Sequence, residues 1–140
     1  MSAYIIERRP ALIVAIRLLD AAGLPTSDLT DAHMEDFFHS GTVGVVGVEL
    51  FGRDALLRSL VVAADHRGLG LGSALVARAE SHARARGART IFLLTTTAEG
   101  FFKCRGYVPA DRGRAPESIR ASREFAELCP ANSAFLFKNL

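Results

Sequence analysis

Three closely spaced glycines in the middle of the chain are the residues that most clearly suggest chemistry. They lie in segment 67–73, which reads RGLGLGS. Glycine has no Cβ atom, so a ligand can approach this backbone closely and left-handed dihedral angles cost little. The residues that follow have a helical pattern, and the unpaired N–H groups and dipole of a helix N-terminus attract anions. With the guanidinium of Arg67 as a further donor, the segment predicts a diphosphate-binding site.

Two other phosphate-binding motifs do not fit this segment. A P-loop needs Gly-Lys followed by Ser or Thr, which is absent. In the dinucleotide pattern G-x-G-x-x-G, the third glycine would fall on Ser73 or Leu75, and residues 87–89 lack the expected acidic side chain. The alternative left open by the segment alone is a glycine-rich turn that binds no ligand.

The elements around this loop follow from hydrophobic patterns and turn residues. Segment 51–54 predicts a hairpin between a strand at 42–50 and a second strand at 55–62, which leads into the loop. After the loop, we expect a helix at 69–86, a strand at 90–96 and helical turns at 99–105. The remaining predicted elements are strands at 4–8, 37–38 and 133–138, and helices at 10–22, 28–35 and 116–128. The succession indicates an α+β fold.

Composition limits the classes of protein to consider. The 140 residues fit one domain, 1–140, and the net charge of +2 is too small to indicate nucleic acid or a membrane surface as a partner. Cys104 and Cys129 form neither a disulfide framework nor a zinc site. No signal peptide is evident, so we expect a cytoplasmic protein.

Two motifs together resemble the GNAT superfamily of N-acetyltransferases. The first is R/Q-x-x-G-x-G/A after a strand ending L-x-V-x-P; segment 60–72 contains L-x-V-x-A and then R-x-x-G-x-G, with Ala64 in place of the proline. The second is A-x-x-F-Y-x-x-x-G-F, and segment 98–107 reads AEGFFKCRGY. Both occur in order and at the family spacing, and the resemblance covers residues 42–107.

The resemblance implies a three-layer α/β/α fold with a mixed, mainly antiparallel sheet of six to seven strands, splayed between strands 4 and 5. It implies acetyl-CoA as cosubstrate, no metal, and direct transfer of the acetyl group to the amine of a small acceptor. Family habit also suggests a homodimer. The residues it assigns to the cofactor are Leu60, Val61, Val62, Arg67, Gly68, Leu69, Gly70, Leu71, Gly72, Ser73 and Phe102.

The catalytic groups are less defined by the motifs. The family often uses the tyrosine of its F-Y pair to protonate the leaving thiolate, but this chain has Phe102 there. The acid could instead be Ser59, a threonine of 95–97, water, or no group at all. Glu49 is the first candidate for the base, with its carboxylate either in the cleft or in solvent at the hairpin.

Arg58 interrupts an apolar strand, and a buried guanidinium needs an anion or several acceptors. One interpretation is an internal salt bridge, with Glu49 across the hairpin as the partner. The other is a catalytic-site clamp for a substrate carboxylate or another oxyanion. Strand alternation predicts that Ser59 points to the opposite face.

The C-terminal third resembles a narrower group, the arsenic-resistance N-acetyltransferases. Segment 116–130 contains P-x-x-I-R-x-S-x-E-F and then L-C-P. By this analogy the acceptor is a small, anionic, amino-acid-like amine, with arsenicals among the candidates, and Arg58, Ser59, Arg120 and Ser122 lie near it. The alternatives are a non-catalytic sensor of acetyl-CoA or CoA, and an acetyltransferase for protein lysines or N-termini.

Overall fold

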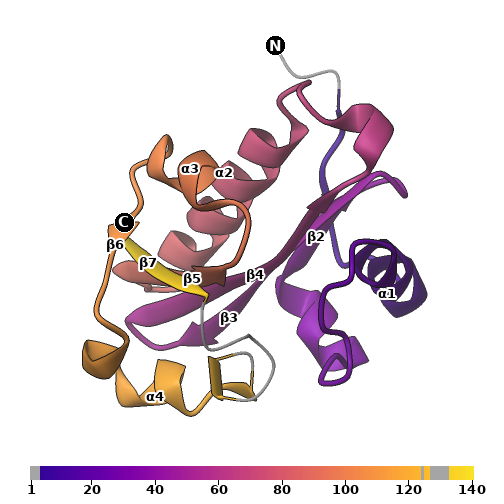
Figure 1. Cartoon of the computed structure of the whole chain (residues 1–140). Coiled ribbons are helices and arrows are strands. Elements are labelled where there is room, and N and C mark those ends of the chain that lie inside the picture. Colours follow the sequence, from indigo (N-terminus) through magenta and orange to yellow (C-terminus); the bar gives the residue numbers. More distant parts are fainter. Residues whose placement is uncertain (1–3, 124, 127–132) are drawn as a thin grey trace.

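The computed structural model describes residues 4–123, 125–126 and 133–140 (Figure 1). Within these residues a seven-stranded sheet has the order β1-β2-β3-β4-β5-β7-β6. The strands are β1 (Glu7–Arg8), β2 (Phe37–Ser40), β3 (Gly44–Phe51), β4 (Asp54–Val62), β5 (Thr90–Thr95), β6 (Val108–Pro109) and β7 (Ala134–Asn139). The α-helices are α1 (Leu12–Ala21), α2 (Leu71–Ala85), α3 (Glu99–Lys103) and α4 (Glu117–Arg120). Short 3-10 helices are η1 (Asp31–Asp36), η2 (Ala64–His66) and η3 (Arg112–Arg114).

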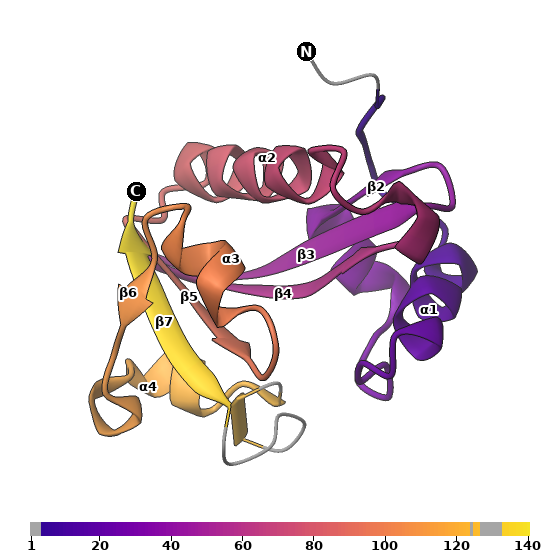
Figure 2. The ribbon, with the colours of Figure 1, turned by 45° about the horizontal axis from the view of Figure 1, so that its top comes forward.

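The sheet is mixed, and helices cover both of its faces. β4 and β5 run parallel, whereas the other neighbouring strands are antiparallel. Helices α2 and α3 lie on one side, and α1 and α4 lie on the other (Figure 2). This arrangement confirms the predicted three-layer fold with a mainly antiparallel sheet.

Helix α2 is the element that joins the sheet to the glycine loop. Its buried residues recur at helical spacing and pack on β3 and β4 in the larger core: Leu71, Leu75, Val76, Ala79 and Ala83. The helix begins after Gly70, and Gly87 follows its C-terminal end with a left-handed φ of 97°. This packing fixes the position of the helix N-terminus relative to the end of β4.

The opposite face of the sheet has two smaller cores. Ala15 and Leu19 of α1 pack with Phe37, Val45 and Val61. A Cβ atom at Gly47 would lie 2.2 Å from the Phe37 ring, so any larger residue at this position would clash with the ring. Near α4, a separate cluster contains Leu56, Phe92, Ala115, Ile119 and Phe135.

Several element boundaries differ from those predicted. The predicted helix at 28–35 is the 3-10 helix η1, which begins after Thr30. The predicted helix at 116–128 has four regular residues, Glu117–Arg120, and its positions 124, 127 and 128 lie outside the described residues. Strand β6 was not predicted, because two residues carry no periodic pattern.

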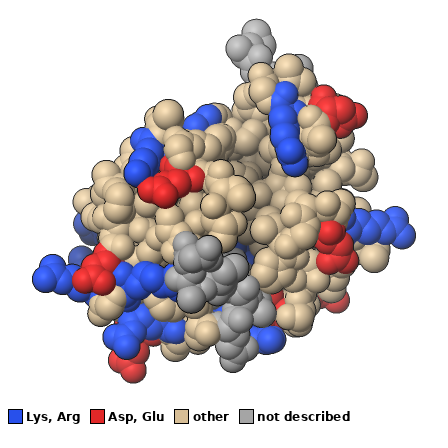
Figure 3. All heavy atoms as spheres, in the orientation of Figure 1, with Lys and Arg blue, Asp and Glu red and all other residues tan. Residues whose placement is uncertain are grey.

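The surface carries both signs of charge. Figure 3 shows acidic and basic side chains interspersed over the face in view, with no extended area of one sign. Among the helices in the described part of the chain, none has both the length and the apolar character that crossing a bilayer requires.

Candidate active site

A gap between β4 and β5 is the main irregularity of the sheet. The strands pair at three positions only, where Asp54–Leu56 lie beside Thr90–Phe92. Leu57–Val62 and Leu93–Thr95 continue beyond the last pair, and Figure 2 shows β5 running away from β4 towards α3. The predicted splay between the fourth and fifth strands is therefore confirmed.

A β-bulge in β4 lies within this gap. Val45 pairs with Val61 and Gly47 pairs with Arg58, so Ser59 and Leu60 oppose a single residue of β3. Ser59 has a φ of 61°, in the left-handed region that residues other than glycine rarely adopt. Such a backbone costs about 1–3 kcal/mol and is concentrated at functional sites.

The bulge changes the direction of the Ser59 side chain. Strand alternation would point it away from Arg58, but Arg58 Nε donates a hydrogen bond to Ser59 Oγ at 3.1 Å. The prediction that these two side chains occupy opposite faces is wrong, because the left-handed residue interrupts the alternation.

A cavity of about 310 Å³ occupies the space between the diverging strands. Its walls come from the loop after α1, from β4, from β5 and the turn that follows it, from α3 and from the residue before β7. The lining residues are Gly23, Leu24, Pro25, Leu57, Arg58, Ser59, Leu60, Leu93, Leu94, Thr95, Thr96, Thr97, Ala98, Phe102 and Ser133. The candidate acids Ser59 and Thr95–Thr97 thus lie around one cavity, and Phe102 replaces the family tyrosine on its wall.

The glycine loop has the backbone that the sequence predicts. Gly68 and Gly70 have left-handed φ values of 77° and 89°, and a Cβ atom added at either one would meet no other atom within 4 Å. Gly70 is the N-cap of α2, a helix of 15 residues. The exposed Arg67 side chain folds back along the loop, where its Nε donates to Val62 O at 3.0 Å. The loop therefore presents an open backbone, a helix N-terminus and a cation together.

The side chains of the predicted cofactor segments differ in their exposure. Val61 and Leu71 are buried in the cores, so only their main-chain atoms can face a ligand. Leu69 is exposed, and Gly72 packs closely under the Phe101 ring. Ser73 Oγ accepts hydrogen bonds from the guanidinium of Arg105, including one from Nε at 2.9 Å, which joins the first turn of α2 to the end of α3.

Arg58 is the centre of a buried ionic cluster. Its side chain is fully buried, and its Nη1 lies 2.9 Å from Glu49 Oε2, as one of the two interpretations predicted. Asp28 was not predicted as a partner, but both its carboxylate oxygens accept from Arg58, with Nη2 to Oδ1 at 3.0 Å. The internal salt bridge is therefore present, and this bidentate contact occupies the donor edge that a substrate carboxylate would need.

The electrostatics of Asp28 follow from this cluster. Burial raises the pKa of the Asp28 carboxyl, but the hydrogen bonds and positive charge of Arg58 lower it more strongly. The resulting pKa lies below the ordinary value of 3.8. Asp28 is thus ionised at neutral pH and balances the buried guanidinium.

Glu49 lies beside the cavity rather than on its wall. It is half-buried, and its carboxylate contacts Arg58 instead of projecting into solvent at the hairpin. Glu49 is not itself a lining residue, but it contacts Arg58, which is one. The role of Glu49 as general base remains a prediction.

Two residues assigned by analogy to the acceptor do not lie at this cavity. Ser122 Oγ donates to Ile119 O at 2.6 Å and accepts from Phe125 N at 3.3 Å, which is a local role at the end of α4. Arg120 is exposed and is not a lining residue. Neither is brought to Arg58 and Ser59.

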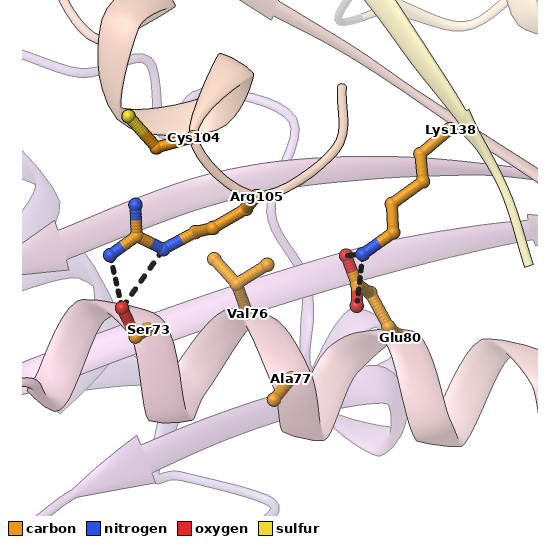
Figure 4. A pocket seen from close by; sticks show the side chains of 7 residues that line it. All are labelled: Ser73, Val76, Ala77, Glu80, Cys104, Arg105 and Lys138. Atoms are coloured by element: carbon orange, nitrogen blue, oxygen red, sulfur yellow. Dashed lines mark hydrogen bonds and ion pairs between the residues drawn. The ribbon is translucent and has the colours of Figure 1, made fainter.

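A second hollow, of about 500 Å³, lies outside the gap between the strands, between α2, the end of α3 and β7 (Figure 4). Glu80 lines this hollow, and it accepts from Lys138 Nζ at 3.1 Å and from Tyr107 Oη at 2.8 Å. Burial, followed by the negative charge and hydrogen bond of Glu80, raises the pKa of Tyr107 far above its ordinary value. Tyr107 is almost fully buried, as its predicted packing role requires.

The chain has the features that a CoA thioester needs. Beyond Leu56, none of the described residues forms a strand beside β4 on its β5 side, so the main-chain polar groups of β4 can bond an extended pantetheine chain. The glycine loop offers open N–H groups to a diphosphate. Among the residues the structure describes, no group of three or more His, Cys, Asp or Glu side chains is arranged to hold a metal ion.

Known proteins share both the sequence motifs and the fold. The model of the acetyltransferase (GNAT) domain family matches residues 33–109, more than half of the chain. Amino-acid acetyltransferases of Ectopseudomonas mendocina and Azotobacter vinelandii are 44% and 42% identical over 66 residues. That stretch is 47% of this chain but only 15% of each relative's length.

Solved structures superpose over nearly all of the chain. N-acetylglutamate synthase from Neisseria gonorrhoeae, complexed with coenzyme A and N-acetyl-glutamate, has a TM-score of 0.81 at 22% identity, covering 100% of this chain and 36% of that one. Rv2747 from Mycobacterium tuberculosis, in a complex with CoA, has a TM-score of 0.79 at 18% identity, covering 97% of this chain and 99% of that one. At these identities the likeness concerns the fold. With the splayed sheet, the glycine loop and the matched domain, the chain belongs to the GNAT acetyltransferase family.

Proposed function

We propose that the protein is an acetyl-CoA-dependent N-acetyltransferase that acts on the amine of a small amino-acid-like acceptor. The observation that carries this proposal is the gap in which β4 and β5 separate after Leu56, with the Ser59 bulge inside it and the N-terminus of α2 at its end. A thioester extended along β4 would have its diphosphate at Gly68–Ser73 and its acetyl group near the bulge. The similarity to amino-acid acetyltransferases supports an amino acid as acceptor.

The chemistry would be direct transfer within a desolvated cavity. Bound acetyl-CoA supplies the acetyl group: the acceptor nitrogen bonds to the acetyl carbon, the carbon–sulfur bond breaks, and the sulfur takes a proton. The protein's residues would orient the two reactants and move protons. Glu49 is our candidate for receiving the amine proton through water, because its carboxylate is held in place by Arg58 at the edge of the cavity.

Because Phe102 replaces the tyrosine that the family often uses, side-chain hydroxyl groups are the candidates for protonating the sulfur of the leaving thiolate. Phe102 cannot donate a proton, whereas Ser59 and Thr95–Thr97 lie around the same cavity. We do not assign a clamp for an anionic acceptor to Arg58, because its donor edge already binds the Asp28 carboxylate. An anionic acceptor, and an arsenical one, remain predictions that the acceptor screen tests.

The test is an acetylation screen with the purified chain. Acetyl-CoA is mixed with each L-amino acid, with small arsenical and phosphinic amino acids, and with lysine-containing and free N-terminal peptides. Released thiol and the mass of the acetylated product are both recorded. Turnover of one small amine supports the proposal. Binding of acetyl-CoA without turnover would favour a sensor, and acetylation of peptides alone would favour a protein acetyltransferase.

A further inference from the structure

Ser133 presents a buried hydroxyl group that the protein itself leaves unsatisfied. The residue is 6% exposed, and its Oγ is the buried side-chain polar atom with no hydrogen-bond partner in the described part of the chain. A buried hydroxyl without a partner is unfavourable and rare in folded proteins. Ser133 is also a lining residue of the cavity between β4 and β5. Its position therefore suggests that a bound molecule completes its hydrogen bonding.

Ser133 lies immediately before the start of β7, beside the end of β5. It directly precedes Ala134, which pairs with Thr95 at the end of β5. Phe135, two residues on, packs in the cluster beside α4. Arg58 lies on the face of the sheet that carries this cluster, because Leu56, two residues before it on β4, belongs to the same cluster. The glycine loop leads into α2 on the other face of the sheet, so the Arg58 side chain lies across the sheet from that helix.

The charges near Ser133 favour an electron-rich group as its partner. Arg112 Nη1 donates to the main-chain oxygen of Ser133 at 3.1 Å, which brings a guanidinium next to this residue. None of the described lining residues is an Asp or Glu. Within the described part of the wall, a positively charged group would meet no carboxylate, whereas an oxygen atom could accept from the Ser133 hydroxyl.

We propose that Ser133 is a substrate-recognition residue, whose hydroxyl donates a hydrogen bond to a carboxylate oxygen of the acceptor. The acceptor's amine would then point towards the bulge at Ser59. This inference rests on the proposed acetyltransferase function and specifies the acceptor end of the same cavity. It also provides a carboxylate site that does not require Arg58.

Ser122 supplies a matched control, since it is a second buried serine in the same part of the chain. Its hydroxyl donates to Ile119 O and accepts from Phe125 N, so its bonds are satisfied within the protein. Removing the Ser122 hydroxyl should lower stability, whereas removing the unsatisfied Ser133 hydroxyl should not. Comparing the two substitutions therefore distinguishes a serine that stabilises the fold from one that binds substrate.

The experiment measures steady-state kinetics and thermal unfolding for wild type, Ser133→Ala, Ser133→Cys and Ser122→Ala. The acceptors are L-glutamate, or the L-amino acid that wild type acetylates fastest, and the α-carboxamide of the same amino acid. For Ser133→Ala, we expect the acceptor KM to rise about 10-fold or more for the acid and less for the carboxamide, as loss of a hydrogen bond to a charged group implies. The KM for acetyl-CoA and the Tm should stay at wild-type values. Ser133→Cys, which is somewhat larger and donates only weakly, should behave in the same way.

Ser122→Ala should show the converse, with a Tm lowered by about 3–6 °C and an unchanged acceptor KM. The proposal is overturned if Ser133→Ala leaves the acceptor KM unchanged, raises the KM of acetyl-CoA instead, or affects the acid and its carboxamide equally. If wild type acetylates no amino acid, the proposed function itself fails, which is a different result from active wild type with unaltered Ser133 variants.

Discussion

The Arg58 guanidinium and the Asp28 carboxylate, 30 residues apart in the chain, form a bidentate ion pair in the interior of the protein. The Arg58 side chain is 0% exposed and that of Asp28 is 4% exposed, so little solvent screens the contact. The pair attaches the segment between α1 and η1 to β4 beside the Ser59 bulge. The ion pair therefore holds the segment after α1, which forms one wall of the cavity, against β4, which forms another.

This ion pair predicts acid sensitivity. Asp28 has a pKa below 3.8 in the folded protein, so its contribution to stability is complete above the unfolded pKa and is lost as the pH falls through the folded pKa. We expect Asp28→Asn to reduce the free energy of unfolding at pH 7 by about 3 kcal/mol, because Arg58 loses a buried counterion. Chemical denaturation from pH 7 to pH 2 measures both effects.

The control for this variant is Asp31→Asn, at an exposed position in η1. It should unfold like wild type at every pH. If the free energy of unfolding of Asp28→Asn falls in acid as steeply as that of wild type, the ion pair does not contribute the expected pH dependence.

The contact between Tyr107 and Glu80 predicts a loss of stability at the alkaline end. The pKa of Tyr107 is raised above its ordinary value of 10.0, so the phenol stays protonated in the folded chain while the unfolded chain ionises. The contribution of Tyr107 to the free energy of unfolding is complete below pH 10 and declines as the pH rises above that value. Tyr107→Phe should lose this part of the alkaline decline, whereas Tyr4→Phe should keep it. Unfolding by urea between pH 8 and pH 11.5 distinguishes the two variants, and identical curves for both would exclude this role of Tyr107.

Replacing Glu49 tests the candidate base. Glu49→Gln keeps a hydrogen-bond acceptor for Arg58 but cannot take a proton, so kcat/KM should fall roughly 100-fold or more. The acidic limb of the profile of kcat/KM against pH should flatten as well. Glu99→Gln, which changes a surface carboxylate paired with Lys103, serves as the control and should leave the profile unaltered. Persistence of the acidic limb in Glu49→Gln would remove Glu49 as the base.

Local sequence patterns predicted most of the elements that build the site. The glycine loop, the strand before it and the long helix after it depend on residues close in sequence, and their left-handed backbone follows from Gly68 and Gly70. The strand through Arg58 was predicted on the same basis, and its contact with Glu49 across the hairpin was one of the two interpretations that the sequence left open.

Contacts over long sequence distances were not predictable in this way. The burial of Arg58 indicated an anion, but no local pattern connects it to Asp28, which lies in an irregular segment. The reversal of the Ser59 side chain depends on a left-handed backbone at a residue that rarely adopts one. The unsatisfied hydroxyl of Ser133 is a property of three-dimensional packing, because a serine before a strand is ordinarily solvated.

The central claim is that the loop at the start of α2 binds the diphosphate of acetyl-CoA, and a matched pair of glycines tests it directly. Gly70 and Gly87 flank opposite ends of α2, with φ values of 89° and 97° and no atom within 4 Å of an added Cβ. Gly70→Glu and Gly87→Glu thus introduce the same charge with similar backbone strain, but only the first places it at the helix N-terminus.

The measurement is calorimetric titration of wild type, Gly70→Glu and Gly87→Glu with acetyl-CoA, after both variants are confirmed to be folded. We expect wild type and Gly87→Glu to bind with similar Kd values, and Gly70→Glu to bind at least about 10-fold more weakly, because its carboxylate repels the diphosphate. Equal affinities in all three proteins, or no binding by wild type, would contradict the assignment of this loop.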